Sequence, residues 1–438
     1  MAEPAALLQT SLVEPYPLPA RLVGVLGLIV LLGIAWLISG RRKPIPWRMI
    51  ASGLLLQILF AFIILRTDLG LLIFGGARQA VDIVLDFTQR GAGFIFGSLA
   101  EKSGPVGFVF AFQVLPTIIF FSALVSVLYH LGVMQKFVSG LAWMMRRTMR
   151  TSGAESLSVA ANVFVGMTEA PLVVRPYIKG MTSSELMTLM TGGFATIAGS
   201  VYVAYVQFGI DAGHLLAASL MSAPAALLIS KILMPETETP ATVGDAGVPP
   251  ERKTVNLIDA AATGAGEGLR LALNVGAMLL AFVALIAFAD YLIAKVNFAV
   301  DEFYLGRKLG SDLRICPDDL AGIFGFLFGP VAWLMGVPAK DATSVGNLLG
   351  QKIAINEFVA YLSLAREMES GSLDSRSIII ATYALCGFAN FGSVAIQIGG
   401  IGGIAPDRRR DLARFGLRAM AGGAIASFMT ATIAGIFL

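Results

Sequence analysis

The chain has 438 residues, of which 56% are hydrophobic and 14% are charged. Soluble domains carry about 25% charged residues, so this composition and a mean hydropathy of +0.77 exclude an ordinary soluble protein and predict an all-α polytopic membrane protein. The net charge of +3 is too small to indicate a nucleic-acid partner. Two cysteines and two histidines form no disulfide framework or metal motif, and no glycine-rich loop follows a strand, so no organic cofactor is expected.

The chain begins with two predicted spans. An apolar run over residues 22–38 ends at a basic cluster, 41–48, with no small-residue cleavage site after it. We therefore expect an uncleaved first span with the basic loop in the cytoplasm and the N-terminus outside. A second span covers about residues 50–65. Residues 78–90 carry charges every four positions opposite an apolar side, which predicts an amphipathic interfacial helix or a solvated loop helix.

A longer span is predicted over residues 104–131, which include Pro116. It exceeds the roughly 20 residues that a bilayer needs, so it must tilt or protrude. Basic residues between positions 136 and 150 place its far end in the cytoplasm. In the same region, the stretch 133–145 predicts a second interfacial helix.

The next stretch is apolar enough for lipid but is interrupted twice. A hairpin over residues 156–177 carries Glu169 beside the helix breaker Pro171, and a helix over 184–208 is loosened by the glycine-rich run 192–200. A charge at bilayer depth costs roughly 2.5–3.5 kcal/mol, and non-helical backbone is tolerated there only where protein or water satisfies it. An acidic hairpin tip and an unwound helix therefore predict a solute site within the membrane.

The middle of the chain connects this region to a second half. A return span over residues 214–233 leads to a polar linker, 235–253, which we expect on the cytoplasmic side. A second long span covers about 268–293, and the polar segment 297–319 follows outside. Residues 320–337 predict another interfacial helix.

The second half ends with the same kinds of segment. A second hairpin is predicted over residues 341–366 and a second broken helix over 377–401. The basic loop 407–411 is then cytoplasmic, and the last span ends outside at Leu438. Both termini are therefore predicted to be external.

The two halves repeat their landmarks in one order. The run 387–394 echoes 193–201, and Asn356-Glu357 stands where Thr168-Glu169 stood. Paired interrupted segments are the best pointer in a sequence to a transporter's binding site. Three spans separate the hairpins, and this odd number requires the repeats to be inverted. We predict eight transmembrane helices, two re-entrant hairpins and an inverted repeat with two broken helices.

This pattern divides the chain into five parts. They are scaffold helices with an interfacial helix (1–131), a first transport repeat (132–234), a cytoplasmic linker (235–266), a long scaffold helix with an external segment (267–319) and a second transport repeat (320–438).

The segments 162–172, 356–360 and 387–393 resemble the concentrative nucleoside transporters, in particular their bacterial members. The resemblance covers roughly residues 105–438. It implies one nucleoside held at mid-membrane between two hairpin tips and two unwound helices, and sodium-coupled import by alternating access. In elevator fashion, the repeats would move against the two long spans and the first two spans. It also implies a homotrimer through the long spans and a location in the plasma (inner) membrane.

The resemblance implies roles for individual residues. The residues implied to face the nucleobase are Met167, Thr168 and Glu169. Those implied to hold the ribose hydroxyls are Glu357, Asn390 and Ser393, and those implied to pack on the nucleoside are Val201 and Phe388. The implied sodium ligands are the Asn162 side chain, the Val165 carbonyl, the Thr196 hydroxyl and carbonyl, and the Ile197 carbonyl. Met167 departs from the family, which often has Gln there. A thioether is a poor hydrogen-bonding group, so base selectivity cannot be carried over.

Each assignment has a structural alternative. Glu169 could pair with Arg175, Glu357 with Lys352, Asn162 could cap a hairpin helix, Phe388 could belong to the core, and Thr196 and Ser200 could bond back to helix carbonyls. Two functional alternatives also stand. One is a proton-coupled nucleoside carrier in which Glu169 or Glu357 titrates. The other is an intramembrane enzyme that uses the two glutamates as acid and base.

Overall fold

The computed structural model describes residues 18–39, 46–101, 107–242, 254–300 and 319–438, and all regular structure in these ranges is helical. Most of the predicted linker and of the predicted external segment lies outside the described residues. The helices of the first half are α1 (Leu18–Ile38), α2 (Trp47–Arg66), α3 (Asp68–Phe96), the 3-10 turn η2 (Gly97–Ala100), α4 (Phe110–Gln113), α5 (Leu115–His130), α6 (Val133–Met149), α7 (Gly153–Asn162), α8 (Ala170–Val173), α9 (Arg175–Ile178), α10 (Ser183–Ala195), α11 (Gly199–Gln207) and α12 (Ala212–Leu233). The second half contains α13 (Leu257–Val300), α14 (Leu320–Leu334), α15 (Ala342–Ala354), α16 (Glu357–Ser370), α17 (Ser375–Leu385), α18 (Phe391–Ile404), the 3-10 turn η4 (Pro406–Arg408) and α19 (Arg409–Phe437).

Seven helical segments in the described residues are long and apolar enough to cross a membrane. One of them, Ser183–Gln207, is the first predicted broken helix and consists of α10 and α11. The second predicted broken helix is divided into α17 and α18, and neither of these helices alone is long enough to count as a membrane span. The eight-span topology therefore stays a prediction.

Three predicted elements have different bounds in the structure. The interfacial helix expected over 78–90 is part of α3, which has 29 residues because the apolar run before it continues the helix. The helical part of the span expected over 104–131 begins only at Phe110. The second long span begins at Leu257, within the stretch predicted as linker, and α13 is 44 residues long.

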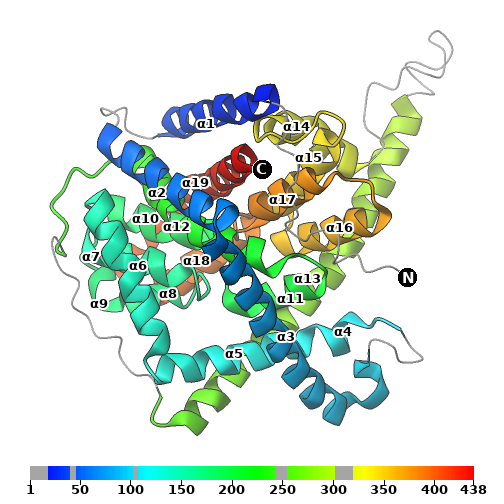
Figure 1. Cartoon of the computed structure of the whole chain (residues 1–438), viewed down its shortest axis with the longest axis horizontal. Helices are drawn as coiled ribbons and strands as arrows, with labels where there is room; N and C mark the ends of the chain where they lie inside the picture. Colours follow the sequence, from blue (N-terminus) through cyan, green and yellow to red (C-terminus); the bar gives the residue numbers. More distant parts are fainter. Residues whose placement is uncertain (1–17, 40–45, 102–106, 243–253, 301–318) are drawn as a thin grey trace.

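The centre of the molecule is built from the helices of both repeats. Helices α10, α12, α17 and α19 pack against one another, and α12 and the part of α19 from Ala419 onward are largely buried (Figure 1). Small residues allow this close approach. A Cβ on Gly422 would crowd Leu233 of α12, and one on Gly423 would crowd Phe194 of α10.

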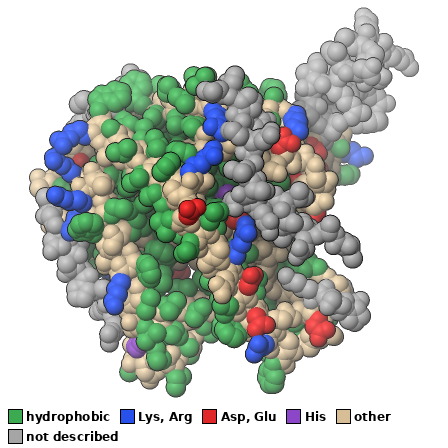
Figure 2. Space-filling model, in the orientation of Figure 1, with side chains coloured by type: hydrophobic (Ala, Val, Ile, Leu, Met, Phe, Trp, Pro, Cys, Tyr) green, Lys and Arg blue, Asp and Glu red, His purple; other side chains and the backbone are tan. Residues whose placement is uncertain are grey.

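The outer helices fall into two groups. Helices α5 and α13 pack along each other and expose much of their apolar surface, whereas α1 and α2 pack on α12 and α19. Helices α1 and α2 thus share interfaces with the repeats, as α5 does through α11, and the grouping of the first two spans with the long helices stays a prediction. Hydrophobic side chains cover much of the visible face of the molecule (Figure 2).

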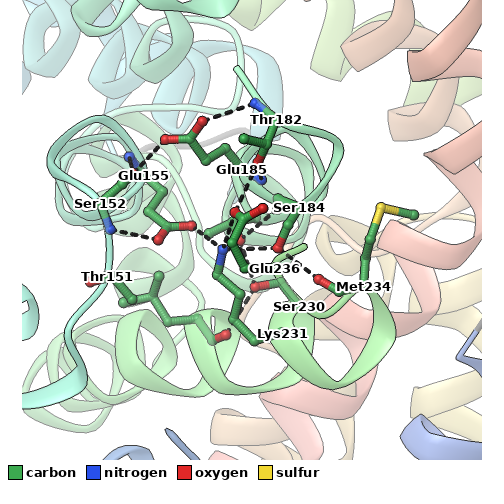
Figure 3. A network of polar contacts seen from close by, with 12 residues as sticks. Thr151, Ser152, Glu155, Thr182, Ser184, Glu185, Ser230, Lys231, Met234 and Glu236 are labelled. Atoms are coloured by element: carbon green, nitrogen blue, oxygen red, sulfur yellow. Dashed lines mark hydrogen bonds and ion pairs between the residues drawn. The ribbon is translucent and has the colours of Figure 1, made fainter. Parts of the chain in front are cut away.

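A buried network of charged and hydroxyl groups anchors the first hairpin (Figure 3). The ammonium of Lys231 at the end of α12 lies 2.6 Å from the carboxylate of Glu155 on α7. Glu155 and Glu185 each complete a capping box, with Ser152 and Thr182, at the starts of α7 and α10. The Ser152 hydroxyl also donates to Glu185. The network thus joins the hairpin, the first broken helix and α12 into one unit.

The second repeat has a simpler counterpart at the start of its hairpin. The Asp341 carboxylate accepts hydrogen bonds from the Asp374 amide at 3.0 Å and the Ser377 hydroxyl at 2.6 Å. In both repeats, a carboxylate thus joins the start of the hairpin to the start of the broken helix, and it belongs to Glu185 of α10 in the first repeat and to Asp341 before α15 in the second. This correspondence agrees with the repeat that the sequence predicts.

Candidate substrate and ion site

The two breaks in the broken helices lie against each other. The first break separates α10 from α11, and the second separates α17 from α18. Gly387 in the second break has φ +134°, and a Cβ there would lie 2.7 Å from the carbonyl oxygen of Phe194 at the first break. Only glycine allows both this conformation and this approach. The unwound segments, far apart in sequence, therefore meet at one place.

The tip of the first hairpin contacts the first break. The Phe164 carbonyl accepts a hydrogen bond from the Gly199 amide at 3.1 Å. The Val163 carbonyl accepts one from the Ser219 hydroxyl of α12 at 2.9 Å. Protein groups thus satisfy these two carbonyls of the non-helical tip, as buried backbone in a membrane requires.

Glu357 accepts hydrogen bonds from side chains of both repeats. It is the first residue of α16, whose start is capped by the Asn356 side chain. The Tyr205 hydroxyl of α11 donates to its Oε1 at 3.0 Å, and the Asn390 amide donates to its Oε2 at 3.2 Å. The side-chain oxygen of Asn390 accepts from the Ser393 amide at 2.8 Å. The predicted ribose-binding residues Glu357, Asn390 and Ser393 therefore lie together.

The alternative pairing of Glu357 with Lys352 is not the arrangement found. Lys352 is fully buried, and its ammonium donates to the Ala384 carbonyl near the end of α17 at 2.7 Å. It also lies 5.6 Å from the ring centroid of Phe428. The lysine therefore binds the second hairpin to the second broken helix, and the hydrogen-bond donors to Glu357 are uncharged.

The residues predicted to face the nucleobase differ in exposure. Met167 is buried, Thr168 is half-buried and Glu169 is exposed. The Thr168 methyl group would lie 3.5 Å from a Cβ on Gly400 of α18. The first hairpin tip therefore packs against the second broken helix as well as the first. Val201 is buried on α11, and Phe388 is half-buried in the second break and packs against the core.

Two of the predicted sodium ligands converge at Gly192 of α10. The Asn162 amide nitrogen would lie 3.5 Å from a Cβ on Gly192, and the Thr196 hydroxyl donates to the Gly192 carbonyl at 2.9 Å. This last bond is the back-bonding that the structural alternative expected. Because the hydroxyl donates its proton there, its lone pairs stay available to a cation.

The Asn162 side chain fits the sodium assignment. It is the last residue of α7, so it does not cap the start of a helix, and its amide nitrogen donates to the Ser158 carbonyl at 3.0 Å. Its amide oxygen is buried and has no hydrogen-bond partner in the described part of the chain. Such an acceptor costs about 1–3 kcal/mol when left unsatisfied. A hard cation such as Na⁺ is a suitable partner for it.

The sequence analysis missed two polar residues at this site. Tyr205 donates to Glu357, and Gln397 of α18 lies with its amide nitrogen 3.8 Å from the Met167 sulfur and 3.1 Å from the Met190 carbonyl. A lone glutamine within the apolar run 394–401 was the available signal for Gln397. Tyr205 gave no signal, because only the fold brings it to Glu357.

Three family models match consecutive parts of the chain. Residues 26–99 match the Na⁺ dependent nucleoside transporter N-terminus, residues 111–212 match a nucleoside recognition (Gate) model and residues 214–435 match the Na⁺ dependent nucleoside transporter C-terminus. An uncharacterized transporter of Haemophilus influenzae is 46% identical over 95% of this chain and 98% of its own length. Sodium/nucleoside cotransporter 1 of Rattus norvegicus is 41% identical over 95% of this chain and 64% of its own length.

The fold has solved relatives as well. A structure of CNTnw in an inward-facing substrate-bound state has a TM-score of 0.86 and 44% identity, and it covers 95% of this chain and 98% of that one. A variant of CNTnw in an outward-facing state has a TM-score of 0.85 and 43% identity, and it covers 95% and 97%. The same fold thus occurs in two states that open to opposite sides.

Proposed function

Because this chain belongs to the concentrative nucleoside transporter family, we propose that it is a sodium-coupled nucleoside importer that works by alternating access. Its matched relatives are transporters, which removes the support for an intramembrane enzyme. The nucleoside lies between the two hairpin tips and the two breaks. The sodium ion lies between the first tip and the first break.

The arrangement of Glu357 is the observation that carries the proposal. A buried carboxylate with an amide and a hydroxyl beside it offers acceptors and donors to a vicinal diol, which is the recognition element of a ribose. The donors come from α11 and from the break just before α18, so both repeats contribute to one site. A nucleoside bound there contacts both repeats, which must stay together while the binding site moves from one side of the membrane to the other.

The sodium site follows from the buried Asn162 oxygen. The proposed ligands are the Asn162 side chain, the Val165 carbonyl, both oxygens of Thr196 and the Ile197 carbonyl. Backbone carbonyls freed by unwinding coordinate ions in transporters with discontinuous helices. The membrane potential supplies about 2.3 kcal/mol per charge per 100 mV, so one sodium ion can drive accumulation.

The architecture of the moving parts is also proposed. Eight spans and two re-entrant hairpins form an inverted repeat, with both termini outside the plasma (inner) membrane. The two repeats move as an elevator against a scaffold of α1, α2 and the long helices α5 and α13. The chain also forms a homotrimer through the long helices α5 and α13, as the family resemblance implies; their apolar surfaces are exposed in the single chain to lipid or to a second copy.

Uptake into proteoliposomes tests the proposal. Purified protein is given radiolabelled purine and pyrimidine nucleosides, with sodium or choline outside, at fixed potential and with pH varied separately. Sodium-dependent accumulation is expected. Accumulation driven by a pH gradient in choline would favour the proton-coupled carrier, and no accumulation of any nucleoside would contradict both.

A further inference from the structure

Gln397 lies where three elements of the site converge. A Cβ on Gly193 would lie 2.6 Å from the Gln397 amide nitrogen and 2.9 Å from the Met167 Cβ. The glycine belongs to the last turn of α10, Met167 to the first hairpin tip and Gln397 to α18. Any larger residue at position 193 would displace one of the other two. The glutamine is therefore fitted against the part of the tip that faces the nucleobase.

The hydrogen bonds of Gln397 are incomplete. Its side chain is buried, with 1% of the residue exposed. Its amide nitrogen donates to the Met190 carbonyl at 3.1 Å, which fixes the nitrogen on that side of the amide. Its amide oxygen is buried and has no partner in the described part of the chain. The free group is thus a hydrogen-bond acceptor.

An unpartnered buried amide oxygen is not by itself a binding group. Gln57 of α2 has the same features: it is fully buried, its nitrogen donates to the Gly53 carbonyl at 3.3 Å and its oxygen has no partner in the described residues. Gln397 differs because it contacts Met167 at the hairpin tip. The atom in contact is the amide nitrogen, so the free oxygen belongs to an amide group that lies beside the residues predicted to face the nucleobase.

We propose that Gln397 is a specificity-determining residue, whose amide oxygen accepts a hydrogen bond from a ring N–H on the nucleobase. The inference rests on the proposed function. Met167 cannot supply this acceptor, because a thioether accepts hydrogen bonds only weakly. The side chain on α18 takes over the task, and Met167 packs beside it. The preferred substrates are nucleosides whose base carries a ring N–H, such as uridine and inosine.

Binding to N-methylated nucleosides tests this assignment. Dissociation constants are measured in sodium for uridine against 3-methyluridine and for inosine against 1-methylinosine. The parent should prefer the unmethylated member by about tenfold or more, the factor expected when a buried acceptor gains a donor. In Gln397→Met the preference should fall by at least about tenfold, because the acceptor is lost. Gln57→Met is the matched control and should keep the parent's ratio.

An exchange variant tests the same claim with the side-chain composition of the site unchanged. Met167→Gln combined with Gln397→Met moves the amide across the contact, so preference for the ring N–H should return relative to Gln397→Met alone. An unchanged ratio in Gln397→Met, or equal binding of methylated and unmethylated nucleosides by the parent, would overturn the assignment. If neither variant folds, equal binding of methylated and unmethylated nucleosides by the parent still overturns the assignment. A parent that binds no nucleoside at all would contradict the proposed function instead.

Discussion

The hydroxyl of Tyr205 donates a hydrogen bond of 3.0 Å to the carboxylate of Glu357 and so joins the first broken helix to the tip of the second hairpin. We expect Tyr205→Phe to weaken nucleoside binding about five- to tenfold, because one oxygen of a buried carboxylate loses its donor. Calorimetric titration measures the change. Tyr202→Phe is the control, since that hydroxyl, on the same helix, donates to the Ala212 carbonyl instead. Equal losses in both variants would show that the hydroxyl does not act through Glu357.

The ribose assignment makes a second prediction. Glu357→Gln and Asn390→Ala should each abolish uptake while the protein stays folded, because each removes a group that holds a ribose hydroxyl. Uptake and a thermal melt are measured on the same preparations. The parent should also reject 2′- and 3′-deoxynucleosides. Transport of these compounds at the rate of ribonucleosides would show that the ribose role is wrong.

The two lysine pairs make a prediction about stability. Lys231 and Glu155 are both buried, with side-chain exposures of 5% and 2%, whereas Lys340 and Asp374 have 66% and 38%. Lys231→Met should lower the free energy of unfolding by about 3–5 kcal/mol, because a buried carboxylate loses its cation. Lys340→Met should change it by at most about 1 kcal/mol. Denaturant unfolding in detergent compares the two, and similar effects would refute the structural role given to the buried network.

The predicted topology is tested by labelling. In a variant with Cys316→Ser and Cys386→Ser, single cysteines are placed at position 409 and at position 312, which lies outside the described residues. Position 312 should react with an impermeant maleimide in intact cells, and position 409 only after the cells are opened. Labelling of position 409 from outside would contradict the inverted repeat, because the basic loop there would no longer be cytoplasmic.

The sequence predicted the order of the helices well, since hydropathy and basic loops follow directly from the cost of burying charge in lipid. It predicted the boundaries of α3 and α13 less well, because a helix can continue beyond the membrane where the residues there also favour helix. Packing of α1 and α2 on α12 and α19 was not predictable, because the hydropathy of a span indicates that it lies in the membrane but not which helix it packs against.

The same limit applies to the site. The repeats marked the segments that contain Glu357, Asn390 and Ser393, the resemblance to the family gave these residues their role, and the structure brings them together. Tyr205 and Gln397 were missed because their roles depend on contacts between segments far apart in the chain. The pairing of Glu357 with Lys352 was plausible from spacing alone. Only the position of the Ala384 carbonyl shows where the lysine binds.

Nucleoside binding in sodium and in choline tests the central claim most directly. Coupling requires each ligand to change the affinity of the other by the same factor. The parent should therefore bind nucleoside more tightly in sodium. Asn162→Ala should need more sodium for half-maximal binding, because an oxygen ligand is lost, and Met167→Gln should change the ranking of nucleosides but keep the dependence on sodium. If the parent binds nucleoside equally tightly in both salts, sodium is not the coupling ion and the account is contradicted.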